Sequence, residues 1–337
     1  MNKIVYLLIM AVFSKISRAE LEEFIKKFNL GKLESFEGIR AGIENTNYFV
    51  NTSAGQYVLT IFEKLTYDQA SFYLRFMLHL ANKKTICPKP ILSESSNIIH
   101  SLYNKPAAIV TRLGGFAIEV PNDNHCFQLG KAVAQTHDNA LDFQEKKNNC
   151  RGFDWWQTAT KDIFDFLTSS QQKLIKLELS QQEKFRYSEK YKSLPKAMIH
   201  ADLFKDNVLF TSDKKNKVTD SSSEKLSGLI DFYFAGYDCL VYDLAIALND
   251  WAISTKDDTF GSFRELEFTK LIAGYESVRL LSADEKECLP MMLRGAALRF
   301  WISRLFDWHK PRDASLISPK NPSQFEVILN KRREECN

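Results

Sequence analysis

Short apolar runs separated by turn residues recur along the first third of the chain. Phe36–Asn51 predicts two strands joined by a turn-rich link, and Tyr57–Phe62 predicts a third, β-branched strand. A further buried strand, Ala107–Leu113, runs into Gly114 and Gly115, where we expect an inter-lobe hinge. This part of the chain is therefore predicted to form an antiparallel sheet.

Most of the remaining pattern follows helical spacing. Ser17 and Glu20 form a capping box before apolar residues at helical spacing, which predicts a helix that ends near Gly31. Tyr67–Asn82 predicts a second helix, and the last third of the chain is helical again. Asp154–Lys192 is rich in Gln, Lys and Glu, so we expect it to form a solvated helical face.

One polar motif stands between strand-like segments. It reads His200-x-Asp202-x-x-x-x-Asn207, and Asp231 ends another short apolar strand 24 residues later. One Asp can accept or orient a hydroxyl proton, while an Asn and a second Asp can hold Mg²⁺. Two protein ligands are enough, because nucleotide phosphates and water complete the coordination of Mg²⁺. The pattern predicts a phosphoryl-transfer site with Asp202 as the catalytic residue and Asn207 and Asp231 as metal ligands.

The same residues also have a plainer interpretation. A buried His with surface Asp and Asn on an ordinary hairpin would give part of the pattern. The His two residues before the Asp and the downstream Ile230-Asp231-Phe232 favour the kinase interpretation. We predict a structural role for His200, a packed helical position for His137, and a structural role for Asp243, which could cap its helix or anchor the catalytic loop.

The composition argues against several other classes of protein. The chain has 337 residues, a net charge of +3 and six scattered Cys without metal-binding spacing, so we expect no nucleic-acid partner, structural zinc or disulfide framework. A reducing, cytoplasmic location is predicted. The apolar run Ile4–Phe13 is too short to cross a membrane and lacks a cleavage site, so we expect residues 1–9 to be a non-essential leader and expect no membrane partner. Thr211–Lys225 is of low complexity and predicts a mobile surface loop.

The order of these motifs resembles the aminoglycoside phosphotransferase and choline kinase superfamily. Longer runs resemble the homoserine kinases of that fold, among them Gly42–Val50, His200–Phe210 and Tyr242–Trp251. The resemblance extends over nearly the whole chain from about Met10. It implies an α+β, protein-kinase-like fold with two lobes. Residues 1–112 would form an antiparallel sheet lobe that binds nucleotide phosphates, and residues 113–337 a larger, mainly helical lobe with the catalytic loop, Mg²⁺ and the acceptor.

The resemblance also implies a reaction and roles for individual residues. Asp202 would take up the proton of the acceptor hydroxyl, with Asn207 and Asp231 holding Mg²⁺ on ATP. The glycine-bearing loop would cover the phosphates, and the backbone near the hinge would bind adenine, which gives as nucleotide-binding candidates Gly38, Gly42, Asn45, Asn47, Thr111 and Leu113. The acceptor candidates are Arg299, Tyr233 and Trp251. The reaction implied is transfer of the γ-phosphoryl group to the side-chain hydroxyl of L-homoserine.

The chain departs from the usual kinase pattern at one strand. Thr60 stands where we expect the Lys or Arg that holds the α and β phosphates. No Glu partner is evident in Tyr67–Asn82, where Gln69 is the nearest candidate, and Lys64 lies four residues beyond Thr60. The missing cation keeps a nucleotide-binding pseudokinase as an alternative, although a pure binding module needs no proton acceptor.

A kinase of the same fold for an amino alcohol, sugar or aminoglycoside is the other alternative. An acidic pocket would suit a polycationic acceptor, whereas an amino acid needs a cation for its carboxylate. The helix around Arg299 favours the amino acid, because Arg can bind a carboxylate with two parallel hydrogen bonds. A surface salt bridge is the competing interpretation of Arg294, Arg299 and Arg304.

Overall fold

The computed structural model describes residues 14–39, 44–212, 224–311 and 320–335. Its contacts divide the chain into two compact units. The first unit holds the described residues up to Ala81 together with Pro88–Leu113, and the second holds Asn82–Cys87, Gly114–Pro311 and the residues from 320 onward. The short segment Asn82–Cys87, which the prediction placed in the N-terminal lobe, therefore groups with the second unit.

Three of the predictions concern segments of which little or nothing is described. The proposed leader, residues 1–9, and Gly42 of the glycine-bearing hairpin lie outside the described residues. The same is true of residues 213–223, which make up most of the low-complexity loop.

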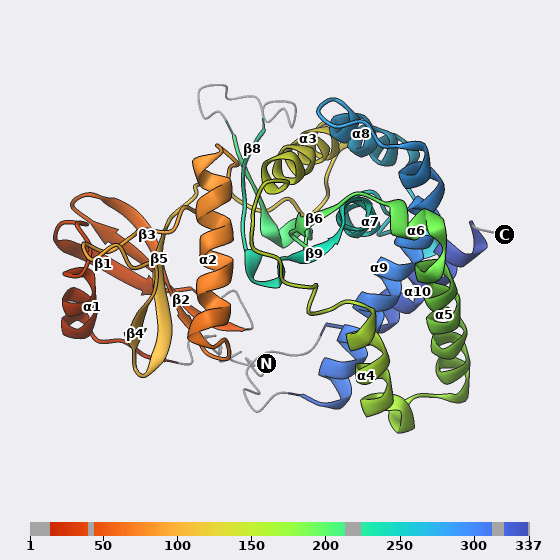
Figure 1. The fold of residues 1–337 in the computed structure, drawn as a ribbon, viewed down its shortest axis with the longest axis horizontal. Coiled ribbons are helices and arrows are strands. Elements are labelled where there is room, and N and C mark those ends of the chain that lie inside the picture. Colours follow the sequence, from red (N-terminus) through yellow and green to blue (C-terminus); the bar gives the residue numbers. More distant parts are fainter. Residues whose placement is uncertain (1–13, 40–43, 213–223, 312–319, 336–337) are drawn as a thin grey trace, which may run out of the picture. The chain divides into compact units, whose positions relative to one another are not determined.

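An antiparallel sheet with the strand order β1-β2-β3-β5-β4 forms the centre of the first unit (Figure 1). The elements of this unit are α1 (Arg18–Ile25), β1 (Leu33–Gly38), β2 (Asn45–Thr52), β3 (Gly55–Phe62), α2 (Tyr67–Asn82), β4 (His100–Leu102) and β5 (Lys105–Thr111). The predicted strands and the predicted bounds of α2 are confirmed. The capping box of Ser17 and Glu20 is confirmed too, but α1 ends at Ile25 and not near Gly31, because the chain turns there and the Phe28 N–H donates to the Ile25 carbonyl.

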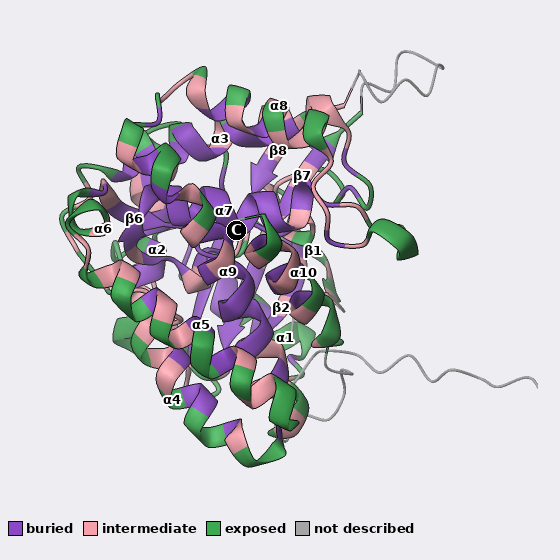
Figure 2. Cartoon of the chain, turned by 90° about the vertical axis from the view of Figure 1, so that its right-hand side faces the viewer, coloured by how far each residue is buried: buried purple, intermediate pink, exposed green. Residues whose placement is uncertain are grey.

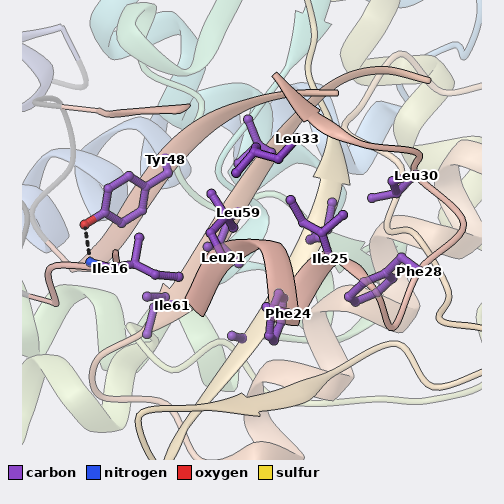
Figure 3. Packing of buried hydrophobic residues seen from close by; sticks show 13 residues of the cluster. Ile16, Leu21, Phe24, Ile25, Phe28, Leu30, Leu33, Tyr48, Leu59 and Ile61 are labelled. Atoms are coloured by element: carbon purple, nitrogen blue, oxygen red, sulfur yellow. Dashed lines mark hydrogen bonds between the residues drawn. The ribbon is translucent and has the colours of Figure 1, made fainter. Parts of the chain in front are cut away.

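The apolar face of α1 packs on one face of this sheet (Figure 3). Leu21, Phe24 and Ile25 meet Leu59 and Ile61 of β3 in one buried cluster. The N–H of Ile16 donates to the Tyr48 hydroxyl over 3.2 Å, which fixes the chain entering α1 to β2. The sheet is therefore anchored by the helix that the capping box begins.

The second unit is mainly helical, with two short hairpins at its centre. Its helices are α3 (Asp123–Ala140), α4 (Phe153–Ile163), α5 (Ser169–Tyr187), α6 (Glu189–Ser193), α7 (Leu240–Trp251), α8 (Glu265–Glu276), α9 (Ala283–His309) and α10 (Ser323–Glu334). Its strands are β6 (Lys196–Ile199), β7 (Val208–Thr211), β8 (Lys225–Leu229) and β9 (Gly236–Cys239), and its 3₁₀ helices are η1 (Phe164–Phe166), η2 (Lys205–Asn207), η4 (Phe232–Phe234) and η5 (Asp257–Thr259). Strand β6 pairs with β9 and β7 with β8, both antiparallel. The predicted α+β fold is confirmed.

Helix α7 forms the core of this unit, and Figure 2 shows both α7 and much of α9 as buried. The polar segment predicted to be a solvated face is only partly so. Glu178 of α5 is fully buried, and its carboxylate lies 2.6 Å from Arg294 and 2.8 Å from Arg333. Burial of this carboxylate is tolerated because two guanidinium groups compensate its charge.

None of the described helices is both long enough and apolar enough to cross a membrane. The described cysteines are all free, and four of the five are buried.

Helices α3 and α8 cross at two glycines and lie side by side in Figure 1. A Cβ on Gly130 would overlap the carbonyl oxygen of Leu271, and a Cβ on Gly274 would overlap the carbonyl of Phe127. We expect Gly130→Ala to lower the free energy of unfolding by about 1–3 kcal/mol, because the helices must separate. Denaturant unfolding measures the change. Gly114→Ala is the control, since a Cβ there meets nothing within 4 Å; equal losses in the two variants would contradict this account.

Candidate active site

The hairpin of β7 and β8 brings two of the predicted site residues together. Asn207 directly precedes β7, and Asp231 lies two residues after β8, which ends at Leu229 and so does not reach Asp231 as predicted. The Ile230 N–H donates to the Asn207 carbonyl over 2.9 Å, and Val208 is paired with Leu229. The expectation that the second strand returns Asp231 beside Asn207 is confirmed.

Asp243, at the start of α7, holds the turn before Asp202. Its two carboxylate oxygens accept the backbone N–H groups of His200 and Ala201 over 2.9 and 2.8 Å. His137 Nε2 lies 3.1 Å from the same carboxylate, which is only 1% exposed. Ala201 has a φ of +63°, a left-handed conformation that is unfavourable for any residue with a Cβ. The anchoring role considered for Asp243 is thus observed, and this carboxylate holds the strained turn in place.

Both histidines predicted to be structural are buried and hydrogen-bonded. His200 Nε2 lies 2.9 Å from the Ile230 carbonyl, and its ring packs against Phe232 with 4.4 Å between centroids. His137 Nδ1 lies 2.8 Å from the Tyr275 hydroxyl. His200 therefore joins the catalytic motif to the residue before Asp231, and His137 joins α3 to α8.

Asp202 is held by Asn207 and faces a buried arginine. The Asn207 side-chain amide donates to the Asp202 carbonyl over 2.8 Å and to its Oδ2 over 3.1 Å. Arg299 Nη1 lies 3.5 Å from the other carboxylate oxygen. Burial raises the pKa of Asp202 above its ordinary range, and the positive charge of Arg299 opposes that shift. A carboxylate in this setting is a stronger base than an exposed one, and it can accept a hydroxyl proton.

The predicted metal ligands offer oxygens that suit Mg²⁺. The amide nitrogen of Asn207 donates to Asp202, so the amide oxygen is the atom of this side chain that could bind a cation. Asp231 is exposed and has a φ of +66°, so it shares the left-handed conformation of Ala201. Among the described residues, no cluster of three or more His, Cys, Asp or Glu forms a complete cage. A cation at these two side chains would take its other ligands from phosphates and water, as Mg²⁺ commonly does.

The three arginines of α9 have different surroundings. Arg294 pairs with buried Glu178, and Arg304 donates to the Asn321 carbonyl and to Gln324, so the hydrogen-bond partners of both lie outside the motif. Arg299 is only 3% exposed, beside Asp202, and its guanidinium lies 3.6 Å from the ring centroid of Phe300. The surface salt bridge is therefore the wrong interpretation of Arg299.

The other two acceptor candidates differ in accessibility. Tyr233 is half-buried in η4, directly after Asp231 and Phe232. Trp251 is fully buried, and its indole N–H donates to the Leu203 carbonyl over 3.1 Å. Trp251 therefore packs against the catalytic loop. Nothing in its surroundings supports the predicted contact with a substrate.

A neighbouring carboxylate escaped the sequence prediction. Asp250 Oδ2 accepts the backbone N–H of Lys205 over 2.8 Å, at the start of η2. Burial raises the pKa of Asp250, and the charge of Lys205 opposes the shift. The sequence offered one signal for this role, because Asp250 directly precedes Trp251 at the end of α7. Asp243 and Asp250 together fix the backbone on either side of Asp202.

In the first unit, the nucleotide-binding candidates lie on the strands around the predicted loop. Gly38 ends β1, and Asn45 and Asn47 lie in β2. The side-chain oxygen of Asn47 accepts the hydroxyl of Thr60 over 2.8 Å. Thr60 is buried and its hydroxyl is bonded to Asn47, so the strand has no positively charged side chain at this position.

Gln69 does not replace the missing acidic partner. Its side chain accepts the Thr66 N–H over 3.1 Å, and its own N–H donates to the Thr66 hydroxyl, so it caps the start of α2. The interpretation of Gln69 as a phosphate-site partner is not supported by this position.

The backbone near the hinge is already partly used. The Thr111 N–H donates to the Lys89 carbonyl over 2.9 Å, and the Arg112 N–H to the Gln56 carbonyl over 3.1 Å. Within the described ranges, the Leu113 N–H has no such partner. Of Thr111 and Leu113, the two residues predicted to bind adenine, Leu113 is therefore the one whose backbone N–H can still donate a hydrogen bond to it.

Comparison with known proteins places these residues in a family. Residues 35–281 match the model of the phosphotransferase enzyme family. The chain is 42% identical to a homoserine kinase of Polaromonas naphthalenivorans over 323 residues, which covers 96% of this chain and 98% of that protein. It is 39% identical to a homoserine kinase of a Janthinobacterium species, with 97% of both chains covered.

Solved structures share the fold at low sequence identity. An amicoumacin kinase in complex with AMP-PNP, Ca²⁺ and the ligand Ami aligns with a TM-score of 0.66 and 15% identity, over 95% of this chain and 93% of that one. A microcompartment-associated aminopropanol kinase aligns with a TM-score of 0.64 and 16% identity, over 95% of each chain. The predicted kinase-like fold is confirmed. The chain belongs to the phosphotransferase enzyme family, in which it is an ATP-dependent small-molecule kinase related to the homoserine kinases.

Proposed function

We propose that this kinase transfers the γ-phosphoryl group of ATP to the side-chain hydroxyl of L-homoserine, a step of threonine biosynthesis. The observation that carries the proposal is the buried Arg299 beside Asp202. An amino-acid acceptor needs a fixed cation for its carboxylate, and Arg provides both the charge and the geometry. The names of the relatives at about 40% identity support the same acceptor.

In the proposed reaction, Asp202 takes up the proton of the homoserine hydroxyl. The hydroxyl oxygen then forms a bond to the γ-phosphorus while the bond from that phosphorus to the β-phosphate oxygen breaks in line, releasing ADP. Asn207 keeps the Asp202 carboxylate in place through its amide hydrogen bond, and Arg299 holds the acceptor carboxylate. Tyr233 remains a candidate for the wall of the acceptor site.

The proposed metal ligands are the oxygens of Asn207 and Asp231. Bound Mg²⁺ would neutralise the charge that develops on the phosphates. On the nucleotide side, we propose that backbone N–H groups between Gly38 and Asn47, including Asn45, bind phosphate, and that Leu113 binds adenine. Free N–H groups of a glycine-bearing turn can form an anion-binding site even without a strand Lys.

Two other interpretations are weaker. A pseudokinase would not need the buried base Asp202, the hydrogen bond from Asn207 that holds it, or the second acidic residue, Asp231. A polycationic aminoglycoside would bring positive charges toward Arg299, which like-charge repulsion disfavours. The aminopropanol and amicoumacin kinases have the same fold, but their identity to this chain is too low to indicate which acceptor it uses.

The experiment that tests the proposal measures ADP release with Mg·ATP across a panel of acceptors. The panel contains L-homoserine, L-serine, L-threonine, choline, ethanolamine and kanamycin. The proposal predicts the highest kcat/KM for L-homoserine. A preference for another acceptor would contradict the substrate but keep the chemistry, and nucleotide binding without turnover of any acceptor would favour the pseudokinase.

Removal of the second metal ligand should affect the nucleotide more than the acceptor. We expect Asp231→Ala to raise the KM for Mg·ATP by at least about tenfold and to raise the Mg²⁺ concentration needed for half-maximal activity, because Asn207 alone would remain. A titration of Mg²⁺ at fixed ATP measures both effects. Asp206→Ala is the control, since its exposed carboxylate pairs with Lys320. An unchanged Mg²⁺ requirement in Asp231→Ala would contradict its role as a ligand.

A further inference from the structure

The segment before α4 is fixed along β9. The Tyr237 N–H donates to the Lys147 carbonyl over 2.6 Å, and Asn148 forms a parallel bridge with Tyr237. A Cβ on Gly236 would come within 2.5 Å of the Asn149 Cα, so glycine is required for this close approach. The Asn149 amide also donates to Asp238 over 3.0 Å. The segment is therefore part of the rigid framework that follows Asp231.

This framework presents one arginine in a defined orientation. The Arg151 N–H donates to the Asn149 side chain over 2.9 Å, and the Arg151 carbonyl accepts the Trp156 indole N–H over 2.6 Å. The guanidinium of Arg151 stacks on the Trp155 ring, 4.2 Å from its centroid. A stacked guanidinium on a fixed backbone loses little freedom when it binds an anion.

Arg151 and Arg299 lie near the same aromatic ring. The guanidinium carbons of the two residues are 5.8 and 5.7 Å from the ring centroid of Phe234. Phe234 comes three residues after Asp231, and Arg299 is the residue that contacts Asp202. Two positive charges from distant parts of the sequence are thus brought to the acceptor end of the proposed site.

We infer that Arg151 is a second specificity-determining residue, which binds the carboxylate of the acceptor together with Arg299. The inference rests on the proposed function and deepens it, because it explains how an α-amino acid is distinguished from an amino alcohol. A carboxylate has two oxygens, so one guanidinium can remain near Asp202 while the other binds the far oxygen. An acceptor without a carboxylate would form no charge-assisted hydrogen bond with either arginine.

The test compares the binding of two ligands of the acceptor site in the Arg151→Met variant. L-Homoserine carries the carboxylate, while 3-aminopropan-1-ol has the same hydroxyl and ammonium groups without it and is measured as a competitor of L-homoserine. We expect the KM for L-homoserine to rise about 10–100-fold, the range for a lost hydrogen bond to a charged group. The inhibition constant of 3-aminopropan-1-ol and the KM for ATP should change less than about twofold, and Arg151→Lys should recover part of the loss.

Arg186→Met is the matched control. Arg186 also stacks on aromatic rings, 4.9 Å from Trp156 and 5.0 Å from Tyr191, but it is not among the residues near Phe234. Its KM for L-homoserine should stay that of the parent protein. An equal rise in the KM for L-homoserine and in the inhibition constant of 3-aminopropan-1-ol in Arg151→Met, or an unchanged KM for L-homoserine, would overturn the inference. Failure of the parent protein to use L-homoserine would instead overturn the proposed function, before any variant is made.

Discussion

The Asp202→Asn variant should retain nucleotide binding and lose nearly all turnover. We expect kcat to fall about 10³-fold, within the usual range for a general base, which corresponds to about 4 kcal/mol of transition-state stabilisation. The amide preserves the shape of the side chain, and it remains within reach of Asn207. Single-turnover kinetics together with a nucleotide titration would separate the chemical step from binding. Near-normal turnover in this variant would remove Asp202 from the mechanism.

The pH profile of the parent protein provides a second readout of the same residue. Asp202 must be ionised to accept a proton, and the ionised fraction falls as the pH drops through its pKa. Because burial raises that pKa despite the opposing charge of Arg299, the acid limb of kcat/KM should lie above the range of an ordinary aspartate. Asp202→Asn should lose this limb along with the activity.

The second large effect is expected from Asp243→Ala. This change leaves the buried N–H groups of His200 and Ala201 without acceptors and removes the partner of His137 Nε2. Loss of one partner from such a buried charged network costs about 3–5 kcal/mol. We therefore expect a fall of that size in the free energy of unfolding, measured by denaturant titration with intrinsic tryptophan fluorescence.

The turn should also lose its shape before the protein unfolds. Ala201 is held at a positive φ by the two hydrogen bonds to Asp243, so kcat should fall even where Asp243→Ala is fully folded. Glu287→Ala is the control, because its carboxylate is exposed and pairs with Lys190 at the surface. A folded Asp243→Ala protein with the stability and turnover of the parent would contradict the anchoring role.

Local signals in the sequence predicted much of this architecture. The Ser17 and Glu20 capping box, the bounds of α2 and the return of Asp231 beside Asn207 all depend on residues close to one another in the chain or on one hairpin. Hydrogen-bonding chemistry and hydrophobic spacing are strong at this range. The length of α1 was wrong because no local signal distinguishes a helix end from the turn at Phe28 that continues its apolar pattern.

Contacts between distant residues were not predictable in the same way. Glu178 looks like a surface residue in its polar segment, but it is buried against Arg294, which is 116 residues away. Gln69 has the right position for a phosphate-site partner, yet its side chain caps α2. Arg151 lies near Phe234 because its segment is bonded to β9, and neither contact has a signal in the sequence. Packing decides these roles, and spacing alone does not reveal them.

The central claim is that the acceptor is the side-chain hydroxyl of L-homoserine, with Asp202 as its base. Phosphorus NMR of the product formed from Mg·ATP and L-homoserine tests this claim most directly. We predict one phosphomonoester signal coupled to the side-chain methylene protons, formed in step with ADP and absent in Asp202→Asn. Inorganic phosphate alone, or an acyl phosphate on the carboxylate that hydroxylamine traps, would contradict the account.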